Sequence, residues 1–218
     1  MKLFRLDSPI MVFLSAVADL VLLNLLWLLC CIPVVTIGAS TTAMYHVLRH
    51  MQADELDSVF RDFFRCFRAD FKQSTLVFLV LLIPIAAIAA NFLLIFNPDN
   101  AANIPTYLRA IWMVSALLVS FICSFAFPTM AYFEDTLLKT LRNASILAIA
   151  NLPRTVLISA LNLSPLILFL TATNFFLRSA IFWLLIGGAL VAYLNMRIVA
   201  PVFRKLLPKT EEAQPEAE

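Results

Sequence analysis

The chain has 218 residues, of which 62% are hydrophobic and only 14% are charged. Soluble proteins average about 45–50% apolar residues and about 25% charged residues, so the composition excludes an ordinary soluble globular domain. The net charge is only +2 and no basic cluster stands apart from acidic neighbours, which argues against nucleic acid as a partner.

Five segments, in chain order, carry almost no charge and are long enough to cross a bilayer. A spanning helix needs about 20 mostly apolar residues, because each residue rises about 1.5 Å through a core about 30 Å thick. The segments are residues 10–31, 76–96, 110–133, 155–177 and 179–196. The sequence therefore predicts an all-α, polytopic transmembrane bundle. Residues 1–207 form one domain, and the acidic tail over 208–218 is expected to be disordered.

The first span contains Asp19, which is the single charged residue in the five segments. An ionised carboxylate at the middle of a spanning helix costs at least about 2.5 kcal/mol on insertion scales. Two interpretations remain open for Asp19. It carries a proton, an ion or a substrate, or it is a neutral or hydrogen-bonded side chain in the bundle interior that meets Asn162 at similar depth.

Residues 33–51, which follow the first span, are semi-apolar and contain several small polar side chains. Within this segment only about 17 residues lie before the charged Arg49, which is short for a spanning helix. This favours a re-entrant or interfacial segment over a sixth span. A sixth span is the alternative, because it would move Lys2 and Arg5 to the inner side. His46 and His50 could share a metal ion, but no third ligand is evident, and a solvated helix face is the preferred interpretation.

An amphipathic helix is predicted over about residues 56–72. Its aromatic face consists of Leu56, Phe60, Phe63, Phe64, Phe67 and Phe71, which recur at helical spacing. The opposite surface is formed by Arg61, Asp62, Arg65, Arg68 and Lys72. We expect Phe63 and Phe67 to lie against lipid or a partner subunit, and Arg61 and Arg65 to reach anionic headgroups. The candidate docking residues are Phe60, Phe63, Phe64, Phe67, Arg61, Arg65 and Arg68.

The later spans add prolines and amides. Pro84 and Pro165 are expected to interrupt the second and fourth spans, as helices are broken near the binding sites of many transporters. Prolines are also common in spanning helices in general. Asn162 and Asn195 are expected to hydrogen-bond between helices.

The basic residues indicate an orientation. In a five-span chain with its N-terminus outside, only Lys2, Arg5, Arg109 and Arg178 of the 16 lysines and arginines lie on the outer side. Because lysine and arginine gather in cytoplasmic loops, the sequence predicts an outside N-terminus and a cytoplasmic C-terminus in the plasma membrane. No nucleotide-binding, hydrolase or metalloprotease motif is present, so neither an enzyme nor a cofactor is expected.

Three stretches resemble the YesL family. They are residues 24–29 with 32–45, the phenylalanine pattern that leads into Phe71-Lys72-Gln73, and residues 151–155. The resemblance spans roughly residues 4–205, with Asp70 where the family usually has Asn. It implies an integral membrane protein of uncharacterised function whose genes often lie beside binding-protein-dependent sugar importers and polysaccharide-degrading enzymes.

Two functions are consistent with this sequence. The first is a non-enzymatic accessory membrane protein that associates with a carbohydrate uptake system through its inner-face helices. The alternative is a small-solute transporter or channel subunit that uses Asp19 and the proline-broken helices.

Overall fold

The computed structural model describes residues 9–95, 105–133 and 136–206, and these ranges contain helices and no strand. Five of the described helices are long and apolar enough to span a membrane, which confirms the predicted fold class. They are α1 (Pro9–Cys30), α4 (Phe71–Ile95), α6 (Thr106–Tyr132), α8 (Leu152–Thr171) and the last span, in which α10 (Ala180–Phe182) continues into α11 (Gly188–Arg204). Lys2, Arg5 and the tail over 208–218 lie outside the described residues.

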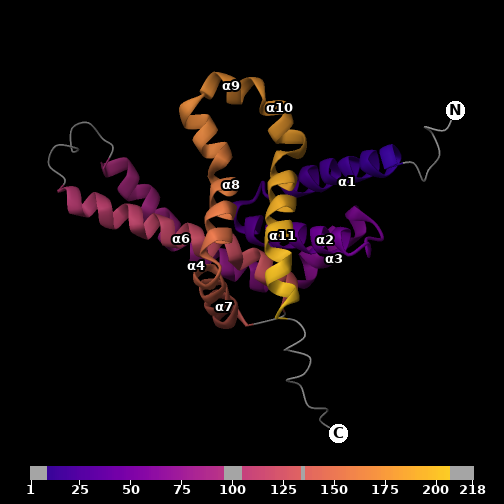
Figure 1. The fold of residues 1–218 in the computed structure, drawn as a ribbon, viewed down its shortest axis with the longest axis horizontal. Helices are drawn as coiled ribbons and strands as arrows, with labels where there is room; N and C mark the ends of the chain where they lie inside the picture. Colours follow the sequence, from indigo (N-terminus) through magenta and orange to yellow (C-terminus); the bar gives the residue numbers. More distant parts are fainter. Residues whose placement is uncertain (1–8, 96–104, 134–135, 207–218) are drawn as a thin grey trace, which may run out of the picture.

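The spans leave a common region in different directions (Figure 1). The α4–α6 hairpin extends to one side, α1 extends to the other, and α8 and α11 rise between them. The short helix α9 (Thr173–Arg178) lies at the tip of the α8–α11 hairpin. The opposite ends of the spans meet near α2 (Ile37–Gln52), α3 (Val59–Ala69) and α7 (Leu137–Ala150).

Helix α2 is the centre of this common region. Nine of its 16 residues are buried, and it packs against α1, α3, α4, α6 and α11. A Cβ atom on Gly38 would lie 2.4 Å from the Ser74 carbonyl oxygen and 2.5 Å from Phe78 Cβ, so glycine permits the close approach of α2 and α4. Ser40 and Thr42 of the segment over 33–51 are therefore buried in the protein, whereas Thr36 and Thr41 are half-buried. The re-entrant or interfacial position of this segment stays a prediction.

The chain turns sharply between α1 and α2, and three hydrogen bonds from side chains hold this turn. Thr36 donates to the Cys30 carbonyl oxygen at 2.6 Å, and Ser40 donates to the Trp27 carbonyl oxygen at 3.0 Å. Trp27 Nε1 donates in turn to Thr41 Oγ1 at 3.2 Å. The last carbonyl groups of a helix have no partner within it, so these hydroxyls end α1 and attach it to α2.

The helices are not broken where the prolines predict. Pro84 and Pro165 lie inside α4 and α8, which continue through them. The irregular segment is a π-helical turn over Trp183–Gly187, between α10 and α11. There the side-chain amide of Asn24 donates to the Leu184 carbonyl oxygen and accepts from the Ala189 N–H, each at 2.8 Å.

Three predicted boundaries also change. The amphipathic helix is shorter than residues 56–72, because α3 ends at Ala69 and Phe71 begins α4. The fourth span ends at Thr171 rather than at 177. The last span continues beyond 196 to Arg204.

Candidate functional site

The exposed flank of α3 carries a groove with both aromatic and basic walls. It is lined by Phe60, Arg61, Phe64, Arg65 and Arg68 and has a volume of about 750 Å³. Phe60 is 56% exposed and its ring centroid lies 4.9 Å from that of Phe64. The side chain of Arg61 lies 3.4 Å from the Asp57 carboxylate, and both are exposed. Aromatic rings beside guanidinium groups suit a surface that meets lipid headgroups or an acidic partner.

The other predicted docking residues of α3 point into the protein. Phe63 is fully buried in a core cluster with residues of α1 and α2, and Phe67 is half-buried against the same cluster. The prediction that Phe63 faces lipid or a partner is therefore wrong, because its side of α3 packs on the protein's own helices. Asp62 is also buried, at 1% exposure, with Oδ1 2.7 Å from Arg65 Nη2, so it is not part of the exposed polar surface.

A second hollow lies where α2, α3, α4 and α6 meet, and no motif in the sequence predicted it. It has a volume of about 520 Å³ and is lined by His46, Arg49, Arg65, Cys66, Ala69, Asp70, Gln73, Met130 and Phe133. We call it the Arg49 cavity. His46 Nε2 lies 2.9 Å from Asp70 Oδ2. Arg49 donates to the Ala131 carbonyl oxygen, and its guanidinium lies 5.5 Å from the centre of the Tyr132 ring.

The two histidines of α2 are not on a solvated face. His46 and His50 are both partly buried, and the described residues contain no cluster of three or more potential metal ligands. Burial and the nearby Arg49 guanidinium lower the pKa of His50, which therefore favours the neutral form. Burial likewise raises the pKa of the Cys66 thiol. The Arg49 cavity is thus lined by two guanidinium groups, those of Arg49 and Arg65.

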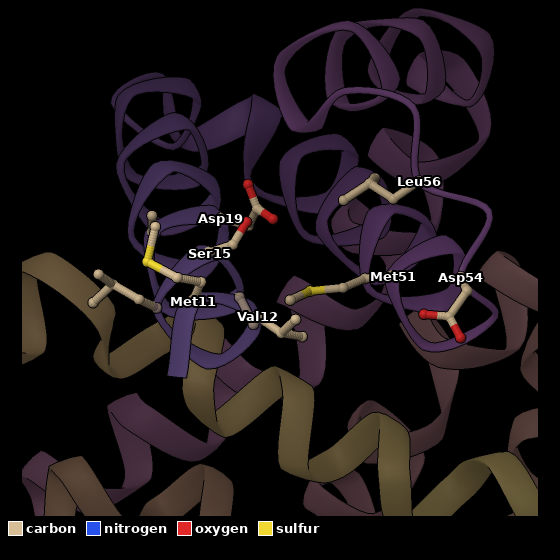
Figure 2. A pocket seen from close by; sticks show the side chains of 10 residues that line it. Met11, Val12, Ser15, Asp19, Met51, Asp54 and Leu56 are labelled. Carbon is tan, nitrogen blue, oxygen red and sulfur yellow. The ribbon is translucent and has the colours of Figure 1, made fainter. Parts of the chain in front are cut away.

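Asp19 lies in an open groove instead of in the bundle interior. The groove has a volume of about 740 Å³ and runs between α1 and the turn after α2. Figure 2 shows Ser15 and Asp19 on α1, opposite Met51, Asp54 and Leu56. Asp19 is half-buried and makes no hydrogen bond or ion pair with the part of the chain that the structure describes. Its polar neighbour across the groove is Asp54, which takes a left-handed conformation with φ of 57°.

Asn162 lies in a separate network of polar side chains. Its Oδ1 accepts from Asn195 Nδ2 at 2.6 Å, and its Nδ2 is 3.5 Å from Ser124 Oγ. Ser124 and Ser159 hydroxyls are 3.0 Å apart, and Asn195 Nδ2 is 3.4 Å from the Tyr45 hydroxyl. The expected pairing of Asp19 with Asn162 is not present. The network joins α2, α6, α8 and α11, which is the role of interhelical hydrogen bonds in membrane bundles.

One comparison with known proteins gives a match. Residues 20–92 match a domain of unknown function, DUF624. No curated protein and no solved structure matches the chain. The matched segment begins in α1, includes α2 and α3, and ends in α4. It therefore contains the α3 groove and most of the residues that line the Arg49 cavity.

Proposed function

We propose that this multi-pass membrane protein is a non-enzymatic accessory component of a binding-protein-dependent carbohydrate uptake system, and that it docks on the importer through the α3 groove. The observation that carries the proposal is the exposure of Phe60 beside Phe64, Arg61 and Arg68 on a helix whose other side is buried. Exposed aromatic and arginine side chains are typical of binding hot spots.

The choice of partner rests on the resemblance to the YesL family, whose genes often lie beside sugar importers. The resemblance and the match to DUF624 include the same helices, α1 to α4. Most basic side chains of the described residues lie on α2, α3, α7 and near the end of α11 that meets them, whereas Arg109 and Arg178 lie at the other ends of the spans. This distribution supports a cytoplasmic position for α3, on the side where an importer's nucleotide-binding subunits work.

The transporter alternative has less support. Continuous helices through Pro84 and Pro165 remove the broken helices on which it depended. The groove beside Asp19 is the remaining observation in its favour.

Co-purification from native membranes tests the docking proposal. We expect the importer's membrane and nucleotide-binding subunits, identified by mass spectrometry, to be recovered with the wild-type protein and lost with the double variant Phe60→Ala/Phe64→Ala. A matched control is Leu138→Ala, which removes a 77% exposed apolar side chain from α7. Equal recovery of the importer with the double variant, or its absence from the wild-type sample, would refute the proposal.

A further inference from the structure

We propose that the Arg49 cavity is a binding site for a phosphate group, carried by an anionic lipid headgroup or by a small soluble molecule. This site is distinct from the α3 groove and does not depend on the docking proposal. The two hollows share Arg65 alone among their lining residues.

Two guanidinium groups and one imidazole line the cavity from two helices. His46 and Arg49 come from α2, and Arg65 comes from α3. Arg65 is paired with the buried carboxylate of Asp62 at 2.7 Å, and His46 lies 2.9 Å from Asp70. Arg49 has no carboxylate partner within the described residues. Among the described residues that line the cavity, its guanidinium is therefore the one that is not held in an ion pair.

Arg49 is also held in place with most of its donors free. Its one hydrogen bond within the described chain goes to the Ala131 carbonyl oxygen, and its Cζ lies over the Tyr132 ring, 5.5 Å from the ring centroid. A guanidinium has five N–H donors in a rigid fork, and this fork matches the oxygen spacing of a phosphate group. A half-buried arginine that is fixed by one bond and one ring is preorganised for a bidentate contact with an anion.

Gln73 lines the cavity at the start of α4, and Met130 and Phe133 line it at the end of α6. Asp70 is the single carboxylate among the described residues that line the cavity. It opposes anion binding, so removing its charge should strengthen binding. A residue with only a structural role would not give that result.

The test uses the full chain reconstituted in nanodiscs. One arm titrates inorganic phosphate into protein in neutral phosphatidylcholine nanodiscs by calorimetry. The other arm adds phosphatidylglycerol and counts the lipids retained on the protein by native mass spectrometry. Binding in the first arm identifies a soluble phosphate as the source, whereas retention of anionic lipid in the second identifies a headgroup.

We expect Arg49→Gln to weaken binding about tenfold in the arm that is positive, because a charge-assisted bidentate contact is lost. Asp70→Asn should strengthen it a few-fold, and the control Arg142→Gln, on the exposed surface of α7, should leave it unchanged. If Arg49→Gln does not fold, Asp70→Asn decides the question. No binding in either arm, or an Asp70→Asn protein that binds no more tightly than wild type, would overturn the proposal.

Discussion

The side-chain amide of Asn24 hydrogen-bonds two backbone groups at the π-helical turn over Trp183–Gly187. It bridges the Leu184 carbonyl oxygen and the Ala189 N–H, and it is fully buried. The absence of a side chain at Gly188 permits this contact, since a Cβ atom there would lie 2.8 Å from Asn24 Oδ1 and 2.8 Å from Trp27 Cζ3. Insertion of a side chain into the backbone ladder is a known cause of helix irregularity.

Replacement of Asn24 should therefore destabilise the protein. We expect Asn24→Leu to cost about 1–3 kcal/mol, because a part-buried carbonyl and a buried N–H lose their partner. The control is Asn91→Leu, because Asn91 is exposed and donates only to Ala87 within its own helix. Thermal unfolding in detergent should show a lower Tm for the first variant alone. Equal Tm values for the two variants would contradict this account of Asn24.

At the scale of single elements, α3 shows what the sequence could and could not predict. The periodicity of its phenylalanines correctly predicts an amphipathic helix near residues 56–72. It cannot predict how much of the aromatic face is covered, because that depends on the packing of α1 and α2 against it. The structure buries Phe63 and leaves Phe60 exposed, although both belong to the same predicted face.

This difference within α3 predicts two separable effects. Phe63→Ala should destabilise the protein by about 3–5 kcal/mol, since it removes a fully buried ring from the core. Phe60→Ala should change stability by less than about 0.5 kcal/mol, because the Phe60 side chain is 56% exposed in the folded protein. Denaturation in detergent measures both. A large loss of stability in Phe60→Ala would mean that the α3 groove is part of the core.

The same limit applies to the other sequence predictions. The apolar segments predict five spans because length and composition suffice for that conclusion. The position of Asp19 depends on α2 running back beside α1, which places Asp54 opposite it and which no periodicity reveals. The sequence does not predict the Arg49 cavity, because the residues that line it come from four separate segments of the chain. Arg49 itself lies near the end of the predicted segment over 33–51.

At the scale of the whole molecule, docking on an importer's cytoplasmic subunits depends on which ends of the spans face the cytoplasm. In Figure 1 the ends near α2, α3 and α7 lie together, and the tip with α9 lies apart from them. Both the α3 groove and the Arg49 cavity lie in the common region. A carbohydrate importer's cytoplasmic subunits can reach the α3 groove only if that region is on the inner side.

The most direct test is cysteine accessibility in a background without the four native cysteines. Single variants Lys2→Cys, Arg61→Cys and Arg178→Cys are labelled with a membrane-impermeant reagent on intact cells and on inside-out vesicles. We predict that positions 2 and 178 label from outside and that position 61 labels only from inside. Labelling of positions 2 and 61 from the same side would contradict the five-span topology and indicate a sixth crossing by residues 33–51. Labelling of position 61 from outside would contradict docking on the cytoplasmic side.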